Sequence, residues 1–224
     1  MHPYILPLSR LLKAEANAEA AAGAKAYLLN QFEHFGIATA VRRKLCVDYI
    51  KQNDPLTWDD LEEVVKELWQ MPEREYQHCA IEIVKHHKKV WKKNSIRLME
   101  HCLTHKSWWD SVDGIASDWL TDYFRLFPGE IISVTGKWNK SQNIWLQRSS
   151  IMFQKAFKKD TDTTLLSAYI IHLKDSKEFF IQKAIGWALR EYSKIDPQWV
   201  EKFVNQHKLA PLSTREALKR INRE

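Results

Sequence analysis

The feature of this sequence that most constrains its fold is a helix start that recurs at a nearly constant interval. Six Ser, Thr or Pro residues each precede an amphipathic run, and they lie 33, 35, 34, 35 and 37 residues apart, at Thr39, Pro72, Ser107, Ser141, Ser176 and Ser213. Ser and Thr often cap helix N-termini and Pro suits the first turn, so these positions predict one repeated element. Further helical patterns lie between them, at 57–69, 93–104, 128–138, 161–173 and 196–207. Each period is therefore a predicted helix pair.

Helix pairs that recur at this interval are typical of an α-solenoid. The repeat length lies between those of tetratricopeptide and HEAT repeats, and the Trp, Gly, Tyr and Pro pattern of tetratricopeptides is missing from the sequence. We therefore predict an all-α, HEAT-like helical repeat solenoid that forms a single domain over 1–224, with N-terminal capping helices in 1–35 and repeated helix pairs in 36–224. Stacked pairs give such a solenoid a concave face, which suits an extended partner.

The composition agrees with an all-helical protein that no membrane segment anchors. Only 6 Gly and 7 Pro occur in 224 residues, which disfavours a turn-rich β fold. No apolar run approaches the roughly 18 residues that a membrane span needs, and the amino terminus lacks a signal-peptide pattern. Three cysteines without CxxC spacing, Cys46, Cys79 and Cys102, suit buried, reduced thiols. We expect a cytoplasmic protein without a membrane partner.

The segment KSWWDSVDG contains the first candidate site. Trp109 and Asp113 lie four positions apart, so they share one face of the predicted helix. Trp108 and Trp109 cannot point the same way, and the apolar positions that follow place Trp109 and Asp113 nearer the polar side. A purely structural interpretation is also open, in which Trp109 covers an apolar patch and Asp113 pairs with Arg148, one repeat further along.

A second candidate site lies in SKEFFIQKAIGWALREY. Phe179 and Phe180 stand at the predicted helix start, and Trp187 and Arg190 follow about two turns later. Gly186 is unexpected inside a helix, where it costs about 1 kcal/mol relative to Ala. Either the close approach of a backbone or ligand, or a packing contact between adjacent repeats, would explain it.

Basic residues recur in register on the repeated helices. One repeat position carries Asp113, Arg148 and Lys183 in succession, and Arg43 and Arg190 add further cations. Together with the net charge of +6, this pattern predicts a basic face suited to a phosphate backbone such as that of DNA, to which the helix starts at Ser141 and Ser176 would add backbone N–H groups. A solvated charged face is the alternative.

Motifs for other chemistries are missing from the sequence. There is no GxGxxG, Walker-type GxxxxGK[ST], GxSxG or HExxH motif. His86 and His87 stand among lysines without metal-ligand spacing, so we interpret both as surface residues. We expect neither a metal nor another cofactor.

The whole chain resembles the AlkD family of bacterial alkylpurine DNA glycosylases, which have HEAT-like repeats. The stretches that carry the resemblance are ELWQMPEREYQHCA, KSWWDSVDG, NIWLQRSSI, DSKEFFIQKAIGW and LAPLSTREALK. It implies that Trp109 and Trp187 contact the damaged nucleotide, that Asp113 is the catalytic carboxylate and that Arg148 contacts the DNA backbone. Ala38 and Ala40 stand where family members have a polar residue and a Pro, which puts an auxiliary contact from that loop in doubt.

The resemblance also implies an activity. The family releases positively charged N3- and N7-alkylated purines from duplex DNA without extruding the base into a pocket, and we expect a monofunctional enzyme that acts as a monomer. Such purines leave as neutral bases, so a carboxylate that stabilises the developing sugar cation is the group the reaction needs. Two alternatives are a HEAT-repeat DNA-binding protein without activity and a protein-binding scaffold.

Overall fold

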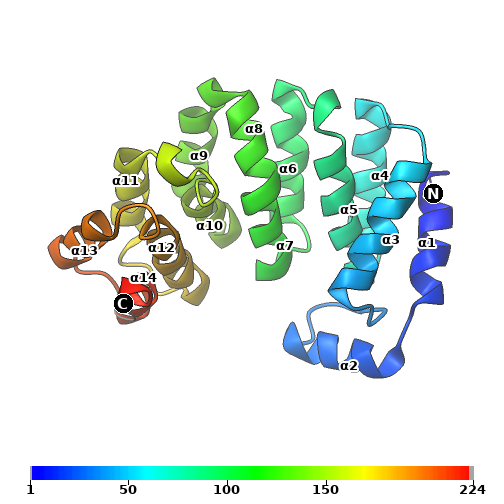
Figure 1. The fold of residues 1–224 in the computed structure, drawn as a ribbon, viewed down its shortest axis with the longest axis horizontal. Helices are drawn as coiled ribbons and strands as arrows, with labels where there is room; N and C mark the ends of the chain where they lie inside the picture. The colour runs from blue at the N-terminus through cyan, green and yellow to red at the C-terminus, as the bar shows by residue number, and fades with distance from the viewer. Residues whose placement is uncertain (1, 222–224) are drawn as a thin grey trace. The chain divides into compact units, whose positions relative to one another are not determined.

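Residues 2–221 are described in a computed structural model, and within this range the secondary structure is helical (Figure 1). The described residues form no β-strand, and Glu33 and Glu73 are joined by one isolated bridge. The all-α prediction is therefore confirmed. The chain divides into two compact units, Met1–Leu98 and Met99–Glu224, which are described separately below. A single repeat domain over 1–224, with a concave face, stays a prediction.

The N-terminal unit is built around a central helix that is buried on most sides. Its helices are α1(Ile5–Ala14), α2(Ala18–Tyr27), α3(Thr39–Gln52), α4(Trp58–Gln70) and α5(Arg74–His86), followed by the short 3-10 helices η1(Lys88–Val90) and η2(Lys93–Ser95). Helix α5 packs against α3 and α4, and α1 packs against α3 (Figure 1). Leu61, Val64 and Ile83 are among the side chains excluded from solvent in this core. The predicted capping segment 1–35 contains α1 and α2.

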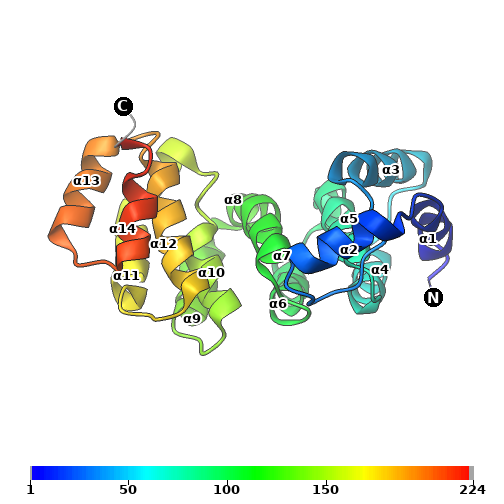
Figure 2. The ribbon, with the colours of Figure 1, turned by 90° about the horizontal axis from the view of Figure 1, so that it is seen from below.

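The C-terminal unit contains both candidate sites. Of the predicted DNA-binding residues, Arg43 alone lies in the N-terminal unit. Its elements are α6(Ile96–Thr104), which begins at the end of the first unit, α7(Trp109–Gly114), the π-helical segment η3(Ile115–Leu120), α8(Thr121–Leu126), η4(Pro128–Glu130), α9(Ile131–Asn139), α10(Ile144–Met152), η5(Lys158–Asp160), α11(Thr163–Leu173), α12(Phe179–Tyr192), α13(Pro197–Gln206) and α14(Pro211–Leu218). Helix α12 lies between α10 and α14 and packs against both (Figures 1 and 2).

The predicted helix starts are right to within three residues. Helix α3 begins at Thr39, and α5, α7, α10 and α12 begin two or three residues after the other predicted starts. Ser213 lies two residues after the start of α14, and its hydroxyl donates to the Gln182 carbonyl oxygen at 2.9 Å. The helix starts earlier because Pro211 occupies its first turn. The intervening helices α4, α6, α9, α11 and α13 also match their patterns.

Two details of side-chain placement bear on the sequence predictions. The three cysteines are free and buried, as predicted. His86 is exposed, but His87 is buried and its Nδ1 lies 2.7 Å from the Ile83 carbonyl oxygen, so the surface interpretation was wrong for His87. Within residues 2–221 no helix is both long and apolar enough to cross a membrane.

Candidate DNA-repair site

The centre of the site is an ion pair between two neighbouring helices. Asp113 on α7 accepts two hydrogen bonds from Arg148 on α10, at 2.7 Å from Nε to Oδ1 and 2.8 Å from Nη2 to Oδ2. The third face of the guanidinium donates from Nη1 to the carbonyl oxygen of Phe180 at 2.5 Å. Arg148 therefore fixes α7, α10 and the start of α12 to one another. The pairing of Asp113 with Arg148, which the purely structural interpretation of the sequence predicted, is therefore present.

The two members of this pair lie at different depths. The Arg148 side chain is 2% exposed, whereas the Asp113 side chain is 16% exposed. A bidentate Arg–carboxylate pair fixes the carboxylate plane as well as its position. Arg148 therefore orients Asp113, which is the more exposed member of the pair. A direct contact of Arg148 with the DNA backbone stays a prediction.

Trp187 on α12 lies among four cations. The indole ring centroid is 5.5 Å from the Arg148 guanidinium carbon, 5.6 Å from Lys155 Nζ, 5.4 Å from Lys183 Nζ and 5.7 Å from the Arg190 guanidinium carbon. These separations lie within the range of cation–π attraction. The Trp187 Nε1 atom is buried and has no hydrogen-bond partner in the described part of the chain. The predicted site residues Asp113 and Trp187 are thus linked through Arg148.

Two of these cations share one carboxylate on the next helix. Glu216 on α14 accepts from Lys183 Nζ at 2.8 Å and from Arg190 Nη1 at 2.7 Å. The hydrogen bond from Lys183 is the main cause that lowers the pKa of Glu216 below its ordinary value. Here the carboxylate is the deeper member, at 10% exposure against 22% for Lys183 and 29% for Arg190.

The position of Gly186 explains why a glycine stands inside α12. A Cβ atom there would lie 2.5 Å from Glu216 Cβ and 2.9 Å from the carbonyl oxygen of Ser213. Helix α14 could not approach α12 this closely beside any larger residue. The two explanations that the sequence left open coincide here, because the packing contact between neighbouring helices includes the close approach of the Ser213 backbone.

An aromatic cluster joins the starts of α7, α10 and α12. Trp108 lies 5.7 Å from Trp145 and 5.3 Å from Phe180, and Trp145 lies 4.9 Å from Phe180, between ring centroids. Trp108 therefore takes the inward position, while Trp109 begins the turn that carries Asp113. Phe179 is 56% exposed beside this cluster and presents an apolar side chain to solvent.

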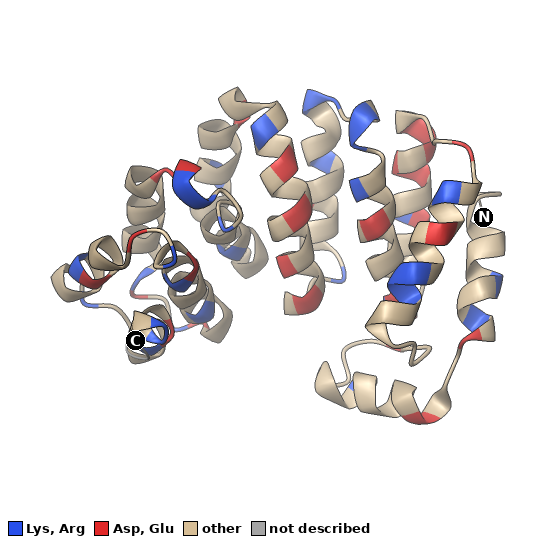
Figure 3. Ribbon diagram, in the orientation of Figure 1, with Lys and Arg blue, Asp and Glu red and all other residues tan. Residues whose placement is uncertain are grey.

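The predicted basic face is more neutralised than the sequence pattern indicated. Arg148, Lys183 and Arg190 are all paired with carboxylates, and Arg43, in the N-terminal unit, donates to Glu82 at 2.8 Å. Figure 3 shows acidic positions along α7 and α8 and both charge types on α12. The cause lies in contacts between residues about one repeat apart, which the spacing of the cations alone does not reveal.

The helix N-termini are also less available than predicted. Asn143 caps α10, and its side chain accepts from the backbone N–H groups of Trp145 and Leu146. The Ser141 hydroxyl instead accepts from the Asn143 N–H, and the Ser176 hydroxyl accepts from the Glu178 N–H. The donors at the start of α10 are therefore partly satisfied within the protein.

Sequence reasoning missed the π-helical segment η3, which begins two residues after Asp113. At its end the Thr121 hydroxyl, in the first residue of α8, donates to the Phe153 carbonyl oxygen at 3.1 Å. Such segments inside α-helices occur frequently at functional sites. The letters IASDWL carry no signal for it. The described residues hold no group of three or more His, Cys, Asp or Glu side chains suited to a metal ion.

The fold and this site define a class of protein: a helical-repeat protein with a fixed carboxylate among aromatic and cationic side chains. A family described as DNA alkylation repair enzyme matches residues 8–221, so the chain belongs to that family. A solved structure described as a predicted DNA alkylation repair enzyme from Enterococcus faecalis is similar, with 32% identity over 94% of this chain and 98% of that chain and a TM-score of 0.87. No protein with a curated functional description matches. The family places the chain in DNA repair, with DNA as its substrate.

Proposed function

We propose that this protein is an AlkD-like, monofunctional DNA glycosylase that hydrolyses the N-glycosidic bond of N3- and N7-alkylated purines in duplex DNA. The observation that carries the proposal is that Asp113 is more exposed than Arg148, its partner in the ion pair. An exposed carboxylate would repel a DNA phosphate, so a surface whose only function is to bind DNA gains nothing from it. A reaction that develops positive charge on a sugar uses such a group directly.

The chemistry needs little more than a fixed carboxylate and water. An alkylated purine is cationic, so it departs as a neutral base without a general acid. When the C1′–N bond breaks, its electron pair leaves with the base and the sugar becomes an oxocarbenium ion. Asp113 stabilises this cation and orients a water molecule, which adds its oxygen to C1′ and releases one proton to the surrounding water. The product is an abasic site, and no lysine Schiff base or strand cleavage is involved.

The aromatic and basic residues supply binding. Trp109 and Trp187 contact the sugar of the damaged nucleotide as positive charge develops, each contact contributing about 0.5–2 kcal/mol. Phe179 and Phe180 contact the DNA near the lesion, and Lys183, Arg190 and Arg43 lie near its backbone. Because the base is not extruded, the site needs no deep pocket for it. The protein acts as a monomer and needs no cofactor.

The test is release of free 7-methylguanine from a defined methylated duplex, measured in single turnover at matched DNA occupancy. Asp113→Asn retains the side-chain shape but removes the charge, and we expect it to slow release about 100-fold. Asp175→Asn is the matched control, because Asp175 is exposed before α12 and lies outside the site. Circular dichroism verifies folding. A slow rate in both variants, or an unchanged rate in Asp113→Asn, would contradict the role of Asp113.

One observation favours a second candidate, a DNA-binding protein without activity. Both oxygens of Asp113 accept hydrogen bonds from Arg148, as they would in an ion pair that only stabilises the fold. The same base-release experiment separates the two functions. Folded, DNA-bound wild-type protein that releases no base would favour the non-catalytic function.

A further inference from the structure

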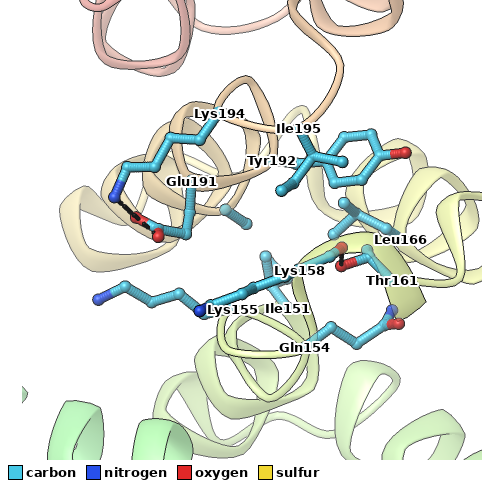
Figure 4. A pocket seen from close by; sticks show the side chains of 11 residues that line it. Ile151, Gln154, Lys155, Lys158, Thr161, Leu166, Glu191, Tyr192, Lys194 and Ile195 are labelled. Atoms are coloured by element: carbon cyan, nitrogen blue, oxygen red, sulfur yellow. Dashed lines mark hydrogen bonds and ion pairs between the residues drawn. The ribbon is translucent and has the colours of Figure 1, made fainter.

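A pocket of about 240 Å³ lies in the C-terminal unit between α10, α11 and α12 (Figure 4). Its apolar wall comprises Ile151, Leu166, Ala188 and Ile195, and Tyr192 adds an aromatic ring. Its remaining wall carries lysines from two directions. As Figure 4 shows, Lys194 extends from the end of α12, while Lys155 and Lys158 come from the turn that follows α10. Glu191 also lines the pocket, which thus combines an apolar wall with a basic rim of three lysines and one carboxylate.

The lysines of the rim are less completely paired with carboxylates than Arg148, Lys183 and Arg190 are. Lys194 is neutralised by Glu191, at 2.7 and 2.8 Å from its two carboxylate oxygens. Lys155 and Lys158 form no ion pair within residues 2–221. Two positive charges therefore face a partly enclosed, apolar space, where an anion is screened less by water than on an open surface.

The turn that carries these lysines is held in place by side chains of the pocket itself. The buried Gln154 amide accepts from Asp162 N–H at 2.7 Å and donates to the Asp162 carbonyl oxygen at 3.2 Å. The Thr161 hydroxyl donates to the Lys158 carbonyl oxygen at 2.7 Å. Lys158 itself has φ +56°, a left-handed conformation that costs a non-glycine residue about 1–2 kcal/mol. The fold thus maintains the basic rim at a conformational cost.

Lys155 also connects the pocket to Trp187. Its Nζ lies 5.6 Å from the Trp187 ring centroid, and Ala188, the next residue of α12, lines the pocket. Lys155 therefore contacts the indole that we place against the damaged nucleotide and also lines the pocket.

We propose that this pocket binds one nucleotide, with its phosphate between Lys155 and Lys158 and its sugar or base against Ile195, Leu166 and Tyr192. The assignment rests on the proposed function in one respect: the nucleotide belongs to the DNA strand beside the lesion. A free nucleoside monophosphate offers the same chemistry, a phosphate on an apolar body, and is the second source to be tested.

The first experiment measures binding rather than base release. Fluorescence anisotropy follows a duplex with one tetrahydrofuran abasic-site analogue, which fixes the register of the protein on the DNA, and a single neutral methylphosphonate replaces each phosphate in turn. We expect Lys155→Gln with Lys158→Gln to bind about tenfold more weakly and to reduce the salt dependence by about one phosphate contact. One methylphosphonate position should weaken the wild-type protein but not this variant, because the partner charges are already gone.

Lys137→Gln with Lys140→Gln is the matched control, because both lysines are exposed on or directly after α9. If it shows the same loss at the same position, general electrostatics explains the result and the pocket assignment fails. Ile195→Glu tests the apolar wall, since Ile195 is partly exposed and the substitution brings a carboxylate to the rim. We expect a similar loss from it, and an unchanged affinity would overturn the placement of the sugar or base.

A titration with dGMP separates the two sources. We call a methylphosphonate position coupled when it weakens binding by the wild-type protein but not by Lys155→Gln with Lys158→Gln. If this variant loses dGMP binding but no position is coupled, the pocket is a nucleotide site and its assignment to the DNA strand is overturned. Absence of both effects overturns the proposal. A coupled position without base release would support the nucleotide site and contradict the proposed glycosylase activity. Base release without a coupled position or dGMP binding would contradict the nucleotide site alone.

Discussion

Two carboxylates of the C-terminal unit are paired across neighbouring helices, yet they are layered in opposite order. Asp113 lies outside its partner Arg148, whereas Glu216 lies beneath Lys183 and Arg190. In the Glu216 cluster the cations are the outer groups and can meet a polyanion. In the Asp113 pair the cation is enclosed and the carboxylate is the outer group. Similar pairings between helices thus produce a binding surface in one place and a candidate reactive group in the other.

The largest expected effect comes from removing the enclosed cation. Arg148→Gln leaves Asp113 without its bidentate partner and the Phe180 carbonyl oxygen without its donor. Breaking a buried ion pair on one side costs about 3–5 kcal/mol, and the partial exposure of Asp113 places the expected loss near the lower end. Urea unfolding measures it. Arg215→Gln, on an exposed face of α14, is the control, and an equal loss in both variants would contradict the comparison.

The next effect concerns the packing beneath Glu216. Gly186→Ala adds a methyl group where Glu216 Cβ and the Ser213 carbonyl oxygen already approach closely. Overpacking of this kind costs typically about 1–3 kcal/mol, which exceeds the gain in helix propensity. Thermal unfolding should show a lower Tm. Gly129→Ala, at a position with open space around it, controls for the loss of a glycine. A Tm for Gly186→Ala at or above that of the wild type would show that α14 can shift without cost.

The helix pairs and their period could be predicted from the sequence because Ser, Thr and Pro near helix starts and apolar spacing are local signals, although the N-cap itself is another residue in each of these helices. The Asp113–Arg148 contact was also within reach, since both residues occupy one repeat position and were recognised as possible partners. The pairing of Lys183 with Glu216 was missed. The cations stood out by their periodicity, but Glu216 lies in a segment, STREALK, with no comparable pattern.

Other features had no sequence signal because they depend on tertiary contacts. The burial of His87 follows from its position on the inner side at the end of α5, and nothing in KHHKK indicates it. That Lys155 and Lys158 form no ion pair with another residue of 2–221 is likewise a property of their surroundings. A charge pattern predicts where cations occur, and the fold decides which of them are neutralised.

A pH titration of stability sharpens the comparison further. The pKa of Glu216 is lowered below its ordinary value of 4.5, mainly by the hydrogen bond from Lys183. The stability that this carboxylate contributes is therefore fully present above about pH 4.5 and is lost as the pH falls through the lowered pKa. We expect the gap in unfolding free energy between wild type and Glu216→Gln to shrink from pH 7 towards pH 3. A gap that stays constant would mean that charge contributes nothing to this cluster.

The smallest effect is expected from removing one of the two outer cations. Arg190→Gln leaves Glu216 paired with Lys183, and Arg190 is itself partly exposed, so the free energy of unfolding should fall by only about 0.5 kcal/mol. Its contribution to DNA affinity should be larger, because an outer cation that loses its charge no longer attracts a phosphate. Urea unfolding and duplex binding on the same preparation measure both. If Arg190→Gln destabilised the protein as much as Arg148→Gln, depth would not distinguish the two clusters, and the argument that Asp113 faces outward for chemistry would lose its basis.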